Sequence, residues 1–304
     1  MARSFLRVPP SVMRVGVRQV GTHCLDPALP WDVQRRRMDQ LTRMVALPRG
    51  TTITRQIIGG VPADVVSARS AVSDPAVIHF HGGGYCVGSA RTARAWAAQV
   101  SAQAGCRVVL PEYRLAPEHP HPAALEDARA VLRALVSEAK SRSLVMSGDS
   151  AGGGLALAVV LSLRDDGAEL PAGCVLLSPW LDLGRDRRAD ADLVQRDLLL
   201  SPDWLDACAR AYADPEGWAD SAVSPLRAAH EGLPPLLIQS GTDEILAPDA
   251  ELLAASTSAA GADVTYTKWP GMWHDFMLQP GLLAAADSAV GQAAWFVGRL
   301  RASS

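Results

Sequence analysis

Residues 144–157 read LVMSGDSAGGGLAL. An apolar run typical of a buried strand ends in a cluster of small residues, and an Ala/Leu-rich run typical of a helix follows. Gly148, Ser150 and Gly152 match the pattern G-x-S-x-G, in which a sharp strand-to-helix turn exposes a serine hydroxyl. The free N–H groups at the start of the helix would favour negative charge beside that serine. The stretch therefore predicts Ser150 as a nucleophile, with an ordinary glycine-rich turn as the alternative.

The rest of the chain repeats this alternation of strand and helix. Short β-branched runs lie near residues 53 and 63 and at 76–80, 107–110, 143–146, 174–177, 235–239 and 263–267. Ala/Leu-rich segments typical of helices lie at 91–104, 123–139, 151–164, 248–260 and 283–301. Continuous apolar strands that alternate with helices predict an α/β fold, with a mostly parallel eight-stranded sheet covered on both faces. Gly59 and Gly60 separate the first two runs and predict a hairpin at an antiparallel edge.

Two regions interrupt the alternation, namely residues 1 to about 50 and residues 184–222. In the second region, Ser201-Pro202 predicts the N-cap and first residue of a helix. We interpret residues 1–50 as the N-terminal part of a cap, 184–222 as a cap insertion, and 51–183 with 223–304 as the catalytic core. A cap would cover the carboxyl edge of the sheet, where open α/β sheets bind ligands. The alternative for the first region is an interfacial helix whose basic residues are Arg3, Arg7, Arg14 and Arg18. Pro9-Pro10 would interrupt such a helix.

A second motif, His81-Gly82-Gly83-Gly84-Tyr85, follows the third predicted strand. Three glycines let several backbone N–H groups point at one anion, because no Cβ stands in the way. Acyl transfer needs such donors where the carbonyl oxygen becomes negative. A phosphate-binding loop is the rival interpretation, but no lysine follows the glycines.

A serine hydroxyl needs a base, and His274 is the histidine in a loop after the last predicted strand. His79 alternates within a strand, which favours a structural role. The acid that orients the base should follow the preceding strand, where Asp243 occupies the turn. Glu244 is its near rival and Asp249 a weaker one, whereas Asp149 and Asp275, next to Ser150 and His274 in sequence, are expected to be structural.

Composition excludes several other classes of protein. Apolar residues make up 48% of the 304 residues, which excludes a disordered chain, and the net charge of −3 does not favour nucleic acid as a partner. No apolar stretch is long enough for an integral membrane protein. The N-terminal residues lack the apolar core of a signal peptide, and the five cysteines have no metal-ligand spacing. We therefore expect a cytoplasmic location for the protein. Its thiols would then be reduced, namely those of Cys24, Cys86, Cys106, Cys174 and Cys208.

Together these motifs resemble the hormone-sensitive-lipase-like branch of the α/β-hydrolases, the bacterial esterase/lipase family IV. The resemblance rests on HGGGY at 81–85, YRLAPE at 113–118, GDSAGG at 148–153, SPWLDL at 178–183 and HDF at 274–276. It implies a triad of Ser150, Asp243 and His274 and a helical cap made from the two interrupting regions. It also implies an oxyanion hole from the N–H groups of Gly82, Gly83 and Ala151, with Gly84 shaping the loop.

The expected activity is hydrolysis of short- to medium-chain carboxylic esters through an acyl-enzyme, without a metal or other cofactor. Lactone, amide, thioester or carbamate hydrolysis on the same triad stays open, because the leaving-group preference depends on pocket shape. A non-catalytic small-molecule receptor is a more distant alternative. Aromatic candidates for the substrate pocket are Tyr85, Trp180, Trp204 and Trp273, and an exposed edge strand could support a homodimer.

Overall fold

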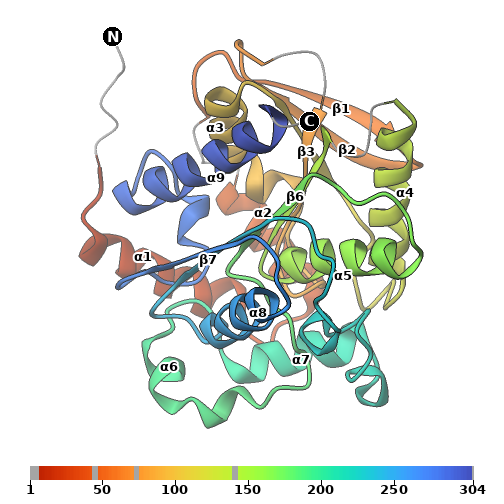
Figure 1. The fold of residues 1–304 in the computed structure, drawn as a ribbon. Coiled ribbons are helices and arrows are strands. Elements are labelled where there is room, and N and C mark those ends of the chain that lie inside the picture. Colours follow the sequence, from red (N-terminus) through yellow and green to blue (C-terminus); the bar gives the residue numbers. More distant parts are fainter. Residues whose placement is uncertain (1–6, 43–46, 72–74, 139–142, 303–304) are drawn as a thin grey trace.

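The computed structural model describes residues 7–42, 47–71, 75–138 and 143–302. All eight predicted strands are present in one sheet, with the order β1-β2-β4-β3-β5-β6-β7-β8. The strands are β1 (Thr52–Ile58), β2 (Val61–Ser67), β3 (Pro75–Phe80), β4 (Arg107–Pro111), β5 (Val145–Asp149), β6 (Gly173–Leu177), β7 (Leu236–Gly241) and β8 (Val264–Trp269). The expected α/β-hydrolase architecture is therefore confirmed (Figure 1).

The antiparallel edge lies where the glycine pair predicted it. β1 pairs with β2 and β2 with β4 in antiparallel fashion, while β4, β3, β5, β6, β7 and β8 pair in parallel. Gly59 and Gly60 both have positive φ, at 59° and 84°, as a two-residue hairpin turn of the mirror-image type requires. The sheet therefore ends at β1 on one side and β8 on the other.

The helices are α1 (Pro10–Cys24), α2 (Trp31–Thr42), α3 (Arg94–Ala104), α4 (Ala123–Glu138), α5 (Ala151–Asp165), α6 (Ala191–Arg196), α7 (Pro202–Tyr212), α8 (Ala247–Ala259) and α9 (Ala284–Ala302). Short 3₁₀ helices are η1 (Ala90–Ala93), η3 (Arg187–Ala189), η4 (Pro215–Gly217), η5 (Pro225–Arg227) and η6 (Phe276–Leu278). Ser201 caps α7 as predicted, because its hydroxyl accepts a hydrogen bond from the Trp204 N–H. None of the helices in the described part of the chain is long and apolar enough to cross a membrane.

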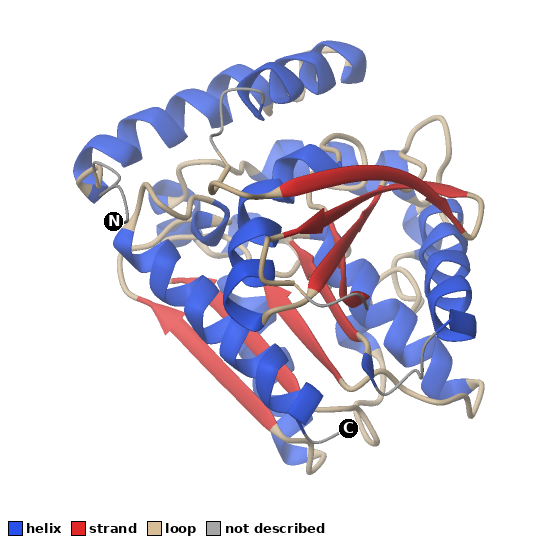
Figure 2. Ribbon diagram, turned by 90° about the horizontal axis from the view of Figure 1, so that it is seen from above, coloured by secondary structure: helices blue, strands red, loops and turns tan. Residues whose placement is uncertain are grey.

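Two apolar layers enclose the twisted sheet, with helices on both of its faces (Figure 2). Successive strand residues alternate between the layers. Val77 and Val108 pack in the layer formed with α3 and α9, and Ile78 and Val109 pack in the opposite layer with α4, α5 and α8. All five cysteines are buried and none forms a disulfide. Burial of both faces explains why the central strands are continuously apolar in sequence.

The two interrupting regions meet over the sheet. Gln34 of α2 accepts a hydrogen bond from Trp204 Nε1 of α7 at 2.9 Å, in a buried contact between the two regions. The insertion is also joined to α8, because Arg187 Nη1 lies 2.6 Å from Asp249 Oδ1 and both side chains are buried. Figure 1 shows α1, α6 and α7 together on one side of the molecule. Segments far apart in sequence thus form one layer, although their division into a separate cap domain stays a prediction.

The helix after the serine packs so closely against β3 that only glycine fits at its second residue. A Cβ on Gly152 would overlap the backbone carbonyl of Phe80, whereas a Cβ on Gly298, in α9, would meet nothing within 4 Å. Gly152→Ala is expected to lower the free energy of unfolding by about 1–3 kcal/mol, the usual cost of overpacking. Gly298→Ala is the matched control and is expected to raise that free energy by up to ~1 kcal/mol. Urea unfolding measures both, and equal shifts in the two variants would contradict the close approach.

Candidate active site

Ser150 lies in the strained turn between β5 and α5. Its φ is 52° and its ψ is −121°, a conformation that L-residues rarely adopt and that costs of the order of 1–3 kcal/mol. The Ser150 N–H donates to Leu177 O, and the Ser150 carbonyl accepts from the Trp180 N–H, both at 2.9 Å. These two bonds to β6 and the loop after it hold the turn. The serine is thus placed at the carboxyl edge of the sheet, at the start of a helix.

The glycine loop after β3 is held against the same turn by Asp149. The Gly82 N–H donates to Asp149 Oδ2 at 2.9 Å, while Asp149 Oδ1 lies 2.9 Å from His79 Nε2. His79 and Asp149 are therefore structural, as expected. The expectation that the Gly82 N–H serves an oxyanion is corrected, because that donor is already used.

In the part of the chain that the structure describes, three backbone N–H groups of the glycine loop and the serine turn have no partner. Within the described residues, the N–H groups of Gly83, Gly84 and Ala151 make no hydrogen bond. Gly83 and Gly84 have φ values of 115° and 60°, which explains why the loop needs glycine there. A Cβ on Gly84 would also contact Trp204 and overlap Cys208 of α7. Gly83 lines the same cavity as Ser150, so its N–H group is available at the site.

The carboxylate at Nδ1 of His274 is that of Glu244. His274 Nδ1 lies 2.9 Å from Glu244 Oε2, and Glu244 Oε1 accepts the Gly241 N–H at 2.9 Å. Glu244 is fully buried, and only 2% of the His274 side chain is exposed. Burial alone would lower the pKa of His274, but the carboxylates of Asp275 and Glu244 raise that pKa well above its usual value.

Asp243 points away from the histidine, which corrects the contact expected from its turn position. Its carboxylate lies 3.0 Å from Arg14 Nη1 of α1 and 3.3 Å from Arg196 Nη1 of α6. Arg14 also donates to the Gly271 carbonyl. Asp243 therefore joins both interrupting regions to the loop after β7. Arg14 is engaged in this contact and Arg7 pairs with Asp287, while Arg3 lies outside the described residues.

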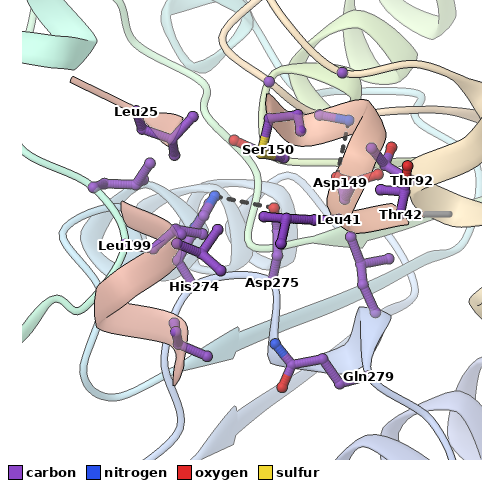
Figure 3. A pocket seen from close by; sticks show the side chains of 18 of the residues that line it. Leu25, Leu41, Thr42, Thr92, Asp149, Ser150, Leu199, His274, Asp275 and Gln279 are labelled. Carbon is purple, nitrogen blue, oxygen red and sulfur yellow. Dashed lines mark hydrogen bonds and ion pairs between the residues drawn. The ribbon is translucent and has the colours of Figure 1, made fainter. Parts of the chain in front are cut away.

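Ser150 and His274 line one open cavity of about 220 Å³ (Figure 3). Its wall is mostly apolar and comes from both interrupting regions as well as from the loops after the strands. The lining from the interrupting regions consists of Val17, Val20, Leu25, Met38, Leu41, Thr42, Leu199, Leu200 and Trp204. The lining from the core consists of Gly82, Gly83, Gly88, Thr92, Asp149, Ser150, His274, Asp275, Leu278 and Gln279.

Trp204 alone among the four aromatic candidates lines this cavity. Tyr85 is buried and stacks on Tyr212, with 3.8 Å between ring centroids. Trp180 and Trp273 are likewise buried in the apolar layers. The expected pocket roles of Tyr85, Trp180 and Trp273 are therefore corrected, because these side chains fill the core instead.

Sequence reasoning missed several residues of the site. The apolar side chains of α1 follow a helical spacing at Val17 and Val20, a signal that could have placed that face over the sheet. Asp275, expected to be only structural, contacts the histidine: its Oδ2 lies 3.1 Å from His274 Nε2. A left-handed backbone at Asp275, with φ of 56°, turns its side chain towards the ring, and no sequence pattern signals that conformation.

Comparisons with known proteins agree with this geometry. Residues 77–278 match the family model described as the alpha/beta hydrolase fold. The chain belongs to the α/β-hydrolase fold family. It is similar to a hormone-sensitive lipase from a metagenome library, with a TM-score of 0.90 and 33% identity over 97% of this chain and 99% of that one. It is also similar to an esterase of the bacterial hormone-sensitive lipase family, with a TM-score of 0.89 and 32% identity over 99% and 100% of the chains.

Curated relatives of this α/β-hydrolase carry related names. The putative acetyl-hydrolase LipR of Mycobacterium tuberculosis is 37% identical over 251 residues, covering 82% of this chain and 81% of that protein. An esterase of Acinetobacter venetianus is 33% identical over 263 residues, covering 85% and 86% of the two chains. The chain is therefore an esterase-type hydrolase of the hormone-sensitive-lipase-like branch, which confirms the resemblance.

Proposed function

We propose that this hydrolase cleaves carboxylic esters with short- to medium-chain acyl groups through Ser150, His274 and Glu244. The observation that carries the proposal is the buried 2.9 Å contact of His274 with Glu244, in a cavity that both His274 and Ser150 line. A carboxylate at Nδ1 keeps a proton on that nitrogen and leaves Nε2 to act as the base. Glu244 takes the role that the sequence pattern assigned to Asp243.

The reaction follows from these positions. His274 Nε2 takes the proton of Ser150 Oγ as the oxygen attacks the ester carbonyl carbon. The carbonyl oxygen becomes negative and is stabilised by the N–H groups of Gly83 and Ala151 and by the start of α5, with Gly84 shaping the loop. The imidazolium gives its proton to the alcohol oxygen as the carbon–oxygen bond breaks, which leaves Ser150 acylated. Water, activated by the same His274, then attacks the acyl-enzyme and releases the acid.

The cavity supports the choice of acyl group. Its wall is apolar on the side of α1 and α2, and Trp204 lies beside the glycine loop. Helices from both interrupting regions cover the site, so an extended acyl chain would have to displace side chains that pack between them. Two of the relatives carry the name acetyl-hydrolase, which agrees with a small acyl group.

A ladder of p-nitrophenyl esters from acetate to palmitate tests the proposal. We expect the highest kcat/KM between acetate and hexanoate and a decline of about tenfold or more by palmitate, because contacts with the pocket set the specificity. Release of p-nitrophenol is followed by absorbance, with Ser150→Ala protein as the control for contaminating enzymes. An optimum at palmitate would contradict the short-chain preference.

Absence of activity on every ester would contradict ester hydrolysis altogether. Lactones and N-acetyl amides would then be assayed with the same two proteins, because the triad serves these substrates as well. Binding without turnover of any substrate would leave the receptor alternative. Location in the cytoplasm and a homodimer stay predictions.

A further inference from the structure

The imidazole of His274 lies between two carboxylates. Its Nδ1 is 2.9 Å from Glu244 Oε2, and its Nε2 is 3.1 Å from Asp275 Oδ2. Figure 3 shows the Asp275 contact inside the cavity that Ser150 lines. Within the described residues, the Ser150 hydroxyl makes no hydrogen bond to His274. The nitrogen that has to receive the serine proton therefore faces a carboxylate in the resting protein.

Asp275 is held in this position at a cost in backbone strain and solvation. Its φ of 56° and ψ of 27° are left-handed, and its N–H donates to Ser178 Oγ at 3.3 Å. Its second carboxylate oxygen, Oδ1, is buried and has no hydrogen-bond partner in the part of the chain described. Strained residues and unsatisfied polar groups of this kind concentrate at functional sites. His274 is thus the principal partner of the Asp275 carboxylate.

The surroundings of the pair are acidic. Glu244 and Asp149 are close enough to influence Asp275, and Asp197, from the insertion, is close enough to interact electrostatically with His274. Burial raises the pKa of Asp275 to about 7, with His274 lowering that pKa and Asp149 and Glu244 raising it further. Burial likewise raises the pKa of Asp197, while His274 lowers it.

Two positive charges near this region are already paired. Arg14 and Arg196 both contact Asp243, which lies next to Glu244 in the chain. Within the described residues, the ring of His274 is the cationic group that contacts the Asp275 carboxylate. Charge on Asp275 would stabilise the imidazolium in the buried site, since opposite charges at such a distance attract strongly there.

We propose that Asp275 is a positioning residue that holds His274 Nε2 in the resting enzyme and stabilises the imidazolium formed during acylation. The inference rests on the proposed function. As Ser150 Oγ bonds to the carbonyl carbon, its proton moves to Nε2, and the resulting cation lies between Glu244 and Asp275. The proton then leaves with the alcohol oxygen. The same attraction holds a proton on His274 in the free enzyme, so activity requires a higher pH than an ordinary histidine would.

Asp275→Asn tests this role because asparagine has the same size, lacks the charge and tolerates a left-handed backbone. We expect the acid limb of the pH profile of kcat/KM to move down by about one pH unit or more. At alkaline pH we expect kcat to fall by about tenfold, because the imidazolium loses a neighbouring charge. Asp275→Gly suits the same backbone and is expected to show the same shift. Asp243→Asn, which removes a nearby carboxylate without contact to His274, is expected to leave the limb in place.

The titration of the His274 ring, followed by NMR, separates this inference from the proposed function. The signal is assigned by its loss in His274→Gln protein, and both Asp275 variants are measured in a Ser150→Ala background, where no turnover is needed. A lower ring pKa in the Asp275 variants supports the inference even if no ester is hydrolysed. If the ring pKa and the acid limb are unchanged in the Asp275 variants, the inference is overturned. This holds even if kcat falls, because a structural effect alone could lower kcat.

Discussion

Ser150→Ala protein is expected to hydrolyse p-nitrophenyl acetate with a kcat about five to six orders of magnitude below that of the wild type, the loss typical of a missing serine nucleophile. Without Oγ no acyl-enzyme forms, and His274 and the backbone N–H groups can only assist attack by water. Some catalysis over water is expected to remain, about 10³-fold, because those N–H groups still stabilise the oxyanion. Steady-state kinetics at several enzyme concentrations measure the difference.

The structure offers a matched control on the same helix. Ser162 lies in the last turns of α5, where its hydroxyl donates to the Val159 carbonyl far along the helix from the cavity. Ser162→Ala should keep wild-type kcat and KM. Treatment with phenylmethanesulfonyl fluoride should add one sulfonyl group to wild-type and Ser162→Ala protein and none to Ser150→Ala, as read by mass spectrometry. Turnover by Ser150→Ala within tenfold of the wild type would show that the nucleophile lies elsewhere.

The fold could be predicted because its signals are periodic and redundant. The central parallel strands are buried on both faces, so apolar runs such as residues 76–80 stand out between Ala-rich helices. The turn at Ser150 and the glycine loop were also predictable, because Gly83, Gly84 and Gly152 occupy positions that a side chain would obstruct. Local steric constraints of this kind require glycine and can therefore be read from the sequence.

The walls of the cavity could not be predicted in the same way. An aromatic residue next to a motif is apolar whether it faces the cavity or the core, and Tyr85, Trp180 and Trp273 all pack inside. Trp204 faces the cavity because α7 packs against α2 through Gln34, a contact 170 residues apart in sequence. Such a contact depends on how distant segments pack together, and a local sequence pattern does not predict that packing.

The choice between two adjacent carboxylates was a problem of the same kind. Asp243 and Glu244 occupy one turn, and each contacts a partner distant in sequence, Arg14 for Asp243 and His274 for Glu244. Arg14 and Arg196 attract Asp243 outwards, and the Gly241 N–H holds Glu244 inwards. The extra methylene of Glu244 gives it the reach to His274 from within the turn. The turn position alone therefore did not predict which of the two carboxylates contacts His274.

Glu244→Gln is expected to lower kcat by about four orders of magnitude, because the amide would force the wrong tautomer on His274. The amide oxygen of the variant would still accept the Gly241 N–H, so its NH₂ group would face His274 Nδ1 and donate to it. Nδ1 would then lose its proton and Nε2 would carry one, leaving no base for Ser150. Fold and cavity should be kept, since the two side chains have the same shape.

Asp243→Asn separates the two assignments. It weakens two ion pairs of partly exposed arginines, which are typically worth about 0–1 kcal/mol each, and it leaves His274 untouched. We expect kcat within a few-fold of the wild type and a slightly lower free energy of unfolding. Glu244→Asp should recover only part of the activity, because the shorter side chain cannot reach Nδ1 from the same turn. The reverse ranking, with Asp243→Asn inactive and Glu244→Gln active, would restore Asp243 as the orienting acid and require the loop after β7 to turn its other carboxylate towards the ring.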